Sequence, residues 1–391
     1  MKKKEINSPR VPVYRDSGFE LYDADTTAAA FKSETSHERE PELYIYSRYR
    51  NPTVVSAEEE VMKLEKCRWA LLTQSGMSAI DTAVSIFQNG KNTGPWLFFT
   101  EIYGGTLSYT NSILIKRRGL EIHSFTPLNG KYNLTDFENV IRSLKPEIVY
   151  IETISNPLVI VTDVIQVIEI AKKWDSKIIV DNTFATPQLF RPLEHGADIV
   201  IHSATKYFSG HGNLTAGVIC GNDKSIMQSA IEYRKFIGHM LSPDDAYMLQ
   251  TQLQSFGLRF ARQCENASAL AEILNKNRLI NKVYFPGLIT HVTHNEAIKL
   301  FGNKGFGAMI TFDFAGKDEN EKRGRRDKFI KMVSEKIKLI PTLGDPHTIL
   351  MPVEAVWGAK YPEPGMIRLS VGFEDYLELE KTIKEALDKV G

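Results

Sequence analysis

The stretch HSATKYFSGHGN, residues 202–213, places a single lysine, Lys206, among small, hydroxylated and flexible residues. A surface loop with one solvated lysine is the simplest interpretation of such a stretch. An amine that is buried away from water, however, has a lowered pKa and becomes a nucleophile near neutral pH. Which of the two describes Lys206 depends on the other polar residues that the fold brings to it.

Other polar residues follow apolar segments in the same way. Ser75 and Gly76 follow the run 69–74, Glu152 lies near the end of 147–153, and Asp181 follows KIIV. Taken alone, each also fits a helix cap or a turn. In open α/β sheets, ligands bind beyond the carboxyl ends of the strands. If these segments are neighbouring strands, one site receives a helix N-terminus for an anion, a carboxylate for a cation, and an isolated amine.

Pyridoxal phosphate is a cofactor that needs all three groups. Its phosphate suits the backbone N–H groups at the start of the predicted helix 75–87. Its ring nitrogen must be protonated, which a carboxylate such as Asp181 would stabilise, and its aldehyde needs an amine such as Lys206. A dinucleotide is disfavoured, because GHGNLTAG lacks the third glycine of the usual fingerprint and opens no evident helix.

Apolar runs that alternate with helices must position these residues. The expected strands are 69–74, 96–100, 147–153, 177–183 and 197–203, and a helix over 56–67 is expected to begin at an N-cap Ser56 with Glu59 completing a capping box. This alternation predicts a mostly parallel sheet covered by helices. After about residue 245 it weakens, and 260–274, 307–314 and 374–390 predict a smaller α+β domain. We therefore expect three units: an N-terminal arm (1–55), an α/β domain (56–245) and a C-terminal domain (246–391).

The composition narrows the class of protein. Lysine plus arginine (48) equals aspartate plus glutamate (48), so net charge gives no support to binding of nucleic acid or an anionic membrane. No apolar run reaches the roughly 18 residues that a membrane span requires. Cys67, Cys220 and Cys264 lie far apart, which disfavours a disulfide framework or a metal site and fits the cytoplasm.

At the level of motifs, residues 181–221 resemble the signature of the Cys/Met-metabolism pyridoxal-phosphate enzymes. That family includes cystathionine γ-synthases, cystathionine lyases, methionine γ-lyases and O-acylhomoserine sulfhydrylases. Further motifs resemble the family in the same order: VPVYRDSGF, YIYSRYRNPT, QSGMSAI, YGGT, ETISNP and RLSVGFED. The resemblance covers nearly the whole chain. It implies the aspartate-aminotransferase-like α/β fold (fold type I) with a smaller C-terminal α+β domain.

The resemblance also implies roles for individual residues. Lys206 would hold the cofactor covalently and move protons, Tyr103 would stack on its ring and assist as acid or base, and Asp181 would pair with the ring nitrogen. Arg368, helped by Asn156, would bind the substrate carboxylate. The phosphate would be held by Ser75, Gly76, Met77, Ser203 and Thr205. Tyr46 and Arg48 match residues that reach the phosphate of a neighbouring subunit, which implies a homotetramer built as a dimer of dimers.

The implied reaction is elimination at the γ-carbon of a sulfur amino acid, of the methionine γ-lyase or cystathionine γ-lyase type. Replacement at the γ-carbon of an O-acylhomoserine and a cofactor-binding protein without turnover are the alternatives. Methionine γ-lyases often carry cysteine where this chain has Gly105. Between Thr342 and Arg368 the connection is shorter than is usual in the family, so residues 351–366 are expected to line the substrate side-chain pocket. Glu354 and Trp357, in this segment, are therefore expected to be substrate-binding. Thr342 is also expected to be substrate-binding, because it lies in the family-like stretch PTLGD that should be fixed around the substrate carboxylate.

Overall fold

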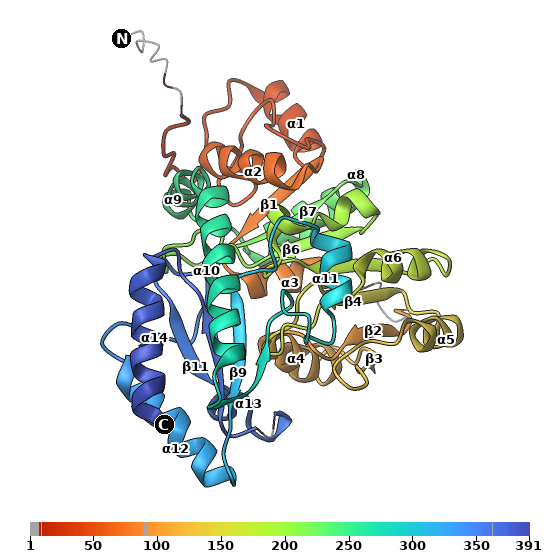
Figure 1. The fold of residues 1–391 in the computed structure, drawn as a ribbon. Coiled ribbons are helices and arrows are strands. Elements are labelled where there is room, and N and C mark those ends of the chain that lie inside the picture. The colour runs from red at the N-terminus through yellow and green to blue at the C-terminus, as the bar shows by residue number, and fades with distance from the viewer. Residues whose placement is uncertain (1–7, 9, 89–92, 362) are drawn as a thin grey trace.

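The computed structural model describes residues 8, 10–88, 93–361 and 363–391. Two β-sheets organise these residues (Figure 1). The larger sheet has the strand order β1-β7-β6-β5-β4-β2-β3. Its strands are β1 (Trp69–Thr73), β2 (Trp96–Phe99), β3 (Ile122–Phe125), β4 (Ile148–Glu152), β5 (Lys177–Asp181), β6 (Ile199–His202) and β7 (Gly217–Gly221).

The larger sheet is mostly parallel, as the sequence predicted. Only β7 runs against its neighbours β1 and β6. Strand β7 and the short strand β3 were not predicted from the sequence. All five expected strands are present, and their side chains are almost entirely buried, which explains why they read as continuous apolar runs.

Helices pack against this sheet. α2 (Pro52–Glu65) and α8 (Lys224–Ile237) contact β1, α3 (Gly76–Ser85) contacts β6 and β7, and α6 (Val164–Lys172) contacts β5. The remaining elements of this region are α4 (Gly104–Tyr109), the π-helical turn η2 (Thr110–Ile115), α5 (Leu134–Leu144), α7 (Thr186–Leu189), the 3-10 turn η3 (Pro192–His195) and α9 (Pro243–Leu253).

The expected start of α2 is wrong. The helix begins at Pro52, and Asn51 is the N-cap, whose side-chain oxygen accepts hydrogen bonds from the N–H groups of Thr53 and Val54. Asn-Pro is itself a strong start signal, because asparagine caps well and proline suits the first helical position. Ser56 lies inside the helix, where its hydroxyl accepts a hydrogen bond from Gln250.

The smaller sheet has the order β10-β11-β12-β9-β8 and a core of its own. Phe312 of β9, Phe329 of α12 and Ile383 of α14 lie in that core. Figure 1 shows α10 and α14 lying alongside this sheet. The elements are α10 (Phe256–Lys276), β8 (Ile280–Tyr284), α11 (His294–Phe301), β9 (Met309–Phe314), α12 (Glu319–Val333), β10 (Lys338–Leu339), β11 (Ile349–Pro352), α13 (Val353–Trp357), the 3-10 turn η4 (Gly358–Lys360), β12 (Met366–Ser370) and α14 (Tyr376–Val390).

The N-terminal segment carries one helix, α1 (Ala24–Ser33), and lies beside α2 in Figure 1. The division of the chain at residues 55/56 and 245/246 stays a prediction. The three cysteines are buried and form no disulfide. Within the described ranges, no helix is both long and apolar enough to cross a membrane.

Candidate active site

A cavity of about 710 Å³ lies beyond the carboxyl ends of the parallel strands and is closed by residues of the smaller sheet. It brings together most of the residues that the sequence singled out from distant parts of the chain. Those that line it are Ser75, Gly76, Met77, Tyr103, Asn156, Asp181, Ser203, Thr205, Lys206, Thr342, Trp357 and Arg368. Three predicted site residues, Tyr46, Arg48 and Glu354, are not part of this lining.

Lys206 lies in the loop after β6 and is largely buried. Its Nζ donates a hydrogen bond to Thr342 Oγ1 at 2.7 Å. Burial, reinforced by the positive charge of Arg368, lowers the pKa of Lys206 from 10.5 to about 8. The interpretation as a solvated surface lysine is therefore wrong, because this amine is neutral in a sizeable fraction of molecules near physiological pH.

The two glycines that follow Lys206, Gly210 and Gly212, make room for side chains from other parts of the chain. A Cβ on Gly210 would lie 1.5 Å from Nη1 of Arg259, and one on Gly212 would lie 2.1 Å from Oδ1 of Asp345. The Arg259 guanidinium occupies that space to donate hydrogen bonds to the carbonyl oxygens of Tyr207 and Phe208. Gly210 therefore lets Arg259 fix the lysine loop from behind.

Asp181 ends β5 and is buried at the floor of the cavity. Its Oδ1 accepts hydrogen bonds from the N–H (3.0 Å) and hydroxyl (2.5 Å) of Thr183, and its Oδ2 accepts one from the Tyr150 hydroxyl at 3.4 Å. Burial raises the pKa of Asp181. A buried carboxylate that is costly to ionise alone is suited to a cationic partner, such as a protonated ring nitrogen.

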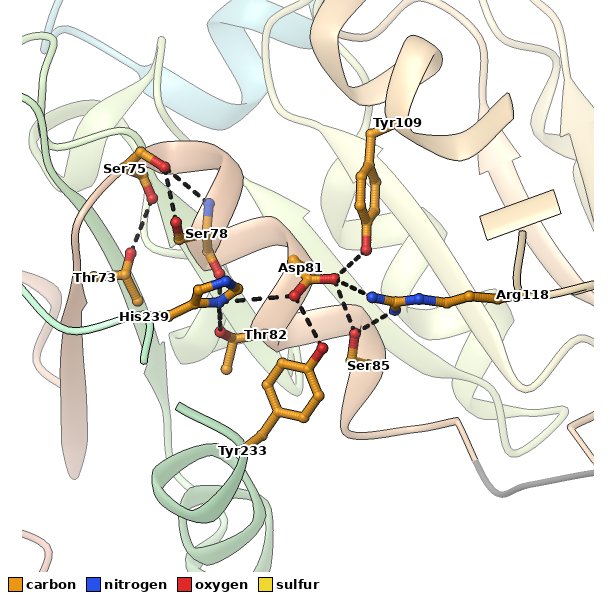
Figure 2. Close-up of polar contacts among 10 residues, drawn as sticks. All are labelled: Thr73, Ser75, Ser78, Asp81, Thr82, Ser85, Tyr109, Arg118, Tyr233 and His239. Carbon is orange, nitrogen blue, oxygen red and sulfur yellow. Dashed lines mark hydrogen bonds and ion pairs between the residues drawn. The ribbon is translucent and has the colours of Figure 1, made fainter. Parts of the chain in front are cut away.

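The first turn of α3 forms the end of the cavity expected to hold phosphate. Ser75 is the N-cap, and its hydroxyl accepts a hydrogen bond from the Ser78 N–H at 3.1 Å (Figure 2). A Cβ on Gly76 would lie 2.9 Å from the Cβ of Ser203, so only glycine lets the helix start this close to the lysine loop. The Thr205 hydroxyl is engaged by both backbone groups of Ala216, at 3.1 and 2.9 Å.

Tyr103 is held through its backbone rather than its ring. Its N–H donates to Glu152 Oε1 at 2.6 Å, whereas its side chain is 48% exposed. Glu152 therefore fixes the start of α4. A Cβ at Gly105 would lie 2.3 Å from the Tyr103 ring, so a cysteine there is incompatible with this ring orientation.

Arg368, on β12, is buried at the smaller-sheet side of the cavity. Its Nη1 donates to Asn156 Oδ1 at 3.0 Å, its Nη2 donates to the carbonyl oxygen of Thr342 at 2.9 Å, and its Nε has no hydrogen-bond partner in the part of the chain described. Thr342 thus contacts both Arg368 and Lys206. The Arg368 guanidinium lies 5.6 Å from the centre of the Trp357 ring, which places Trp357 beside the expected substrate carboxylate.

The structure corrects the expectation for Glu354. Its carboxylate is turned away from the cavity and accepts hydrogen bonds from Arg323 at 2.7 Å and Arg326 at 2.8 Å, both on α12. These hydrogen bonds lower the pKa of Glu354 to about 2. Its negative charge is therefore matched within the smaller domain, and Glu354 does not line the cavity as expected.

Tyr46 and Arg48 lie on the N-terminal segment, exposed and outside the cavity of their own chain. Nη1 of Arg48 donates to the carbonyl oxygen of Lys235 at 2.6 Å, and its guanidinium lies 5.4 Å from the centre of the Tyr46 ring. This placement leaves both side chains at the surface, where a second subunit could be reached. Their role in a partner's site stays a prediction.

Several lining residues were not identified from the sequence. Thr183, which orients Asp181, stood directly after it and could have been found as a hydroxyl at a strand end. Part of the apolar lining had no such signal, because its members come from separate helices and loops: Ile80, Leu107, Ile154, Phe184 and Leu343. Met351 and Val356 also line the cavity, and they belong to the segment 351–366 that was expected there.

Pyridoxal phosphate fits this donor set. Helix-start N–H groups and Ser203 would take the phosphate, Asp181 the ring nitrogen, and Lys206 the aldehyde. The glycine at position 76 keeps open a cradle that any side chain would fill.

Comparisons with known proteins agree with this site. Residues 1–388 match the family model described as Cys/Met metabolism PLP-dependent enzyme. The chain belongs to this family. It is 34% identical over 359 residues to a cystathionine β-lyase of Lactococcus lactis subsp. cremoris, covering 90% of each chain. It is 32% identical over 392 residues to an L-methionine γ-lyase of Fusobacterium nucleatum subsp. polymorphum, covering 97% of this chain and 93% of the relative.

Among solved structures, the chain resembles cystathionine γ-synthase from Xanthomonas oryzae pv. oryzae in complex with cystathionine. The TM-score is 0.85 at 27% identity, over 97% of this chain and 93% of the other. Membership in the family makes the protein a pyridoxal-phosphate enzyme of fold type I. It is an enzyme of sulfur amino-acid metabolism, as the motifs implied.

Proposed function

We propose that this enzyme eliminates the γ-substituent of a sulfur amino acid with an uncharged side chain, of which L-methionine is the model. The products would be a 2-oxo acid, ammonia and a thiol. The observation that carries the proposal is that Met351, Val356 and Trp357 give the cavity an uncharged lining on the side beyond Arg368, which is expected to bind the substrate carboxylate. Bound pyridoxal phosphate supplies an electron sink that acidifies the hydrogen at the α-carbon.

Arg368 and Asn156 would fix the substrate carboxylate through a charge-assisted pair. Lys206, with its lowered pKa, would take the proton from the α-carbon, release it again, and as a neutral amine take a proton from the β-carbon. Thr342 would hold the amine of Lys206 on the side of Arg368, because it contacts both residues. Tyr103 would cover the ring and could transfer a proton while the substrate amine exchanges with Lys206.

The charge of the side-chain pocket argues for the substrate class. Among the described lining residues, the charged ones are Glu152, Asp181, Lys206 and Arg368, and each is accounted for at the cofactor or carboxylate end. With Glu354 turned toward α12, the described lining residues include no carboxylate, apart from Glu152 and Asp181 at the cofactor end, that could meet the distal ammonium of cystathionine. Burial of an unpaired charge is costly. The side of Trp357, Met351 and Val356 therefore suits a thioether better than a zwitterionic tail.

A substrate panel tests the proposal. The purified enzyme is given L-methionine, L-ethionine, L-cystathionine, or O-acetyl-L-homoserine with sulfide, and 2-oxobutanoate, pyruvate and homocysteine are quantified. We expect methionine and ethionine to give 2-oxobutanoate with a higher kcat/KM than cystathionine. Pyruvate from cystathionine as the preferred reaction would instead identify a β-lyase. Absence of product and of any spectral change with every amino acid would support a non-catalytic cofactor-binding protein.

Replacement at the γ-carbon remains the second candidate, because a solved structure that this chain resembles is a cystathionine γ-synthase. Homocysteine formed from O-acetylhomoserine and sulfide, faster than any elimination, would favour it. Assembly as a homotetramer, with Tyr46 and Arg48 completing a partner's site, and a location in the cytoplasm are further parts of the proposal. Sedimentation at assay concentration tests the assembly.

A further inference from the structure

Asp81 is a buried carboxylate that the proposed reaction does not use. It lies on α3, the helix whose first turn forms the expected phosphate site, and it is 9% exposed. Asp81 lies five positions after Gly76, which corresponds to about 7.5 Å along the helix axis. Figure 2 shows it at the centre of a polar cluster drawn from several elements.

Three side chains from three other elements donate to this carboxylate. Oδ1 accepts hydrogen bonds from the hydroxyl of Tyr109, the last residue of α4, and from Nη2 of Arg118 at 2.7 Å. Oδ2 accepts one from the hydroxyl of Tyr233, on α8, at 2.9 Å. One carboxylate therefore joins α3, α4, the turn after η2 and α8.

Ser85 and His239 complete the cluster around Asp81 and Arg118. Ser85 donates to Oδ1 of Asp81 at 3.2 Å and accepts from Nη1 of Arg118 at 2.6 Å. Nδ1 of His239 lies 3.7 Å from Oδ2 and 3.2 Å from the hydroxyl of Thr82. Both carboxylate oxygens thus have partners, and a connected buried network of this kind holds its members in one arrangement.

The charge state strengthens these contacts. Burial acts to raise the pKa of Asp81, but the hydrogen bond from Tyr109 and the charge of Arg118 outweigh it, and the pKa is lowered. The carboxylate is therefore ionised at neutral pH. Hydrogen bonds to an ionised acceptor are roughly twice as strong as neutral ones.

The hydrogen bond between Tyr109 and Asp81 bears on the cofactor site because α4 joins Tyr109 to Tyr103. Tyr103, expected to stack on the cofactor ring, is the residue that precedes α4, and Tyr109 ends it. The six-residue helix is thus held at both ends: by Glu152 at the Tyr103 N–H and by Asp81 at the Tyr109 hydroxyl. Among the described residues, none forms a hydrogen bond with the side chain of Tyr103, so the position of this exposed ring follows that of α4.

We propose that Asp81 is a positioning residue for the cofactor, tying the helix that receives the phosphate to the helix that carries the stacking tyrosine. This inference rests on the proposed cofactor site. The separation between the phosphate position and the Tyr103 ring is set by the contact between Asp81 and Tyr109. The contact with Tyr233 joins the same carboxylate to α8, which carries no residue that lines the cavity.

A matched pair of variants tests this. Tyr109→Phe removes the hydroxyl that links α4 to Asp81, and Tyr233→Phe removes the hydroxyl that links α8 to the same carboxylate. The readouts are the Kd for pyridoxal phosphate, from titration of the cofactor-free protein, and the circular dichroism of the bound cofactor, which reports its stacking. We expect Tyr109→Phe to raise Kd about tenfold, equivalent to about 1.4 kcal/mol, and to weaken the signal. Tyr233→Phe should change Kd less than twofold.

Asp81→Asn should reproduce the Tyr109→Phe effect or exceed it. If Tyr109→Phe lowers Tm but leaves Kd and the dichroism unchanged, or if both phenylalanine variants change them equally, Asp81 is only a stabilising residue and the inference is wrong. These outcomes are distinct from failure of the proposed site, in which the unsubstituted protein itself would not hold the cofactor on Lys206.

Discussion

The lowered pKa of Lys206 predicts how fast the cofactor-free enzyme takes up pyridoxal phosphate at each pH. Only the neutral amine attacks an aldehyde. The ordinary pKa of 10.5 and the value of about 8 here differ by about 2.5, which is a factor of about 300 in the neutral fraction at pH 7. We expect the rate of covalent attachment to rise about tenfold per pH unit up to pH 8 and then to level off.

The assay is stopped-flow absorbance of cofactor-free enzyme mixed with excess pyridoxal phosphate from pH 6 to 10. Nα-acetyl-lysine, which has an ordinary amine, controls for ionisation of the cofactor itself. Arg368→Met should move the midpoint upward, because the Arg368 charge contributes to lowering the pKa of Lys206. If the rate keeps rising to a midpoint near that of Nα-acetyl-lysine, the pKa of Lys206 is not lowered and the prediction is wrong.

Three further predictions follow from the site. Trp357→Ala should change the ratio of kcat/KM between methionine and cystathionine by about tenfold, whereas Glu354→Gln should leave this ratio unchanged. A changed ratio in Glu354→Gln would mean that this carboxylate does contact the substrate. Gly76→Ala should raise the Kd for pyridoxal phosphate at least tenfold, measured by titration, because its Cβ would lie 2.9 Å from that of Ser203; unchanged affinity would mean that α3 moves freely. Mixing inactive Arg48→Ala with inactive Lys206→Ala should restore activity through hybrid sites once subunits exchange, and full activity in a sedimenting monomer would exclude a shared site.

Residues at strand ends could be predicted because local pattern decides them. Asp181, Lys206 and Ser75 each follow an apolar run, and parallel strands bring such ends to one edge of a sheet. The five buried strands could be predicted as well, because each reads as a continuous apolar run. Strand β7 and its reversed direction could not, because a short apolar run carries no signal of strand direction.

Contacts between distant residues could not be predicted. Glu354 was expected at the substrate because it belongs to the segment 351–366. Its carboxylate instead accepts hydrogen bonds from Arg323 and Arg326, about 30 positions earlier in the chain. The reason for Gly210 is also such a contact, because this glycine makes room for Arg259 from a distant part of the chain. The cluster around Asp81 likewise has no sequence signature, since Tyr233 alone lies 152 positions after Asp81 and His239 lies further still.

The claim that Lys206 holds pyridoxal phosphate in this cavity has one most direct test. The purified protein is treated with borohydride, which makes the link between the lysine and the cofactor permanent, and the modified peptide is identified by mass spectrometry, with Lys206→Ala treated in parallel. We expect a single phosphopyridoxyl group on the peptide that contains Lys206, and no such group in Lys206→Ala. Modification at another lysine, or retention of the group in Lys206→Ala, would contradict it.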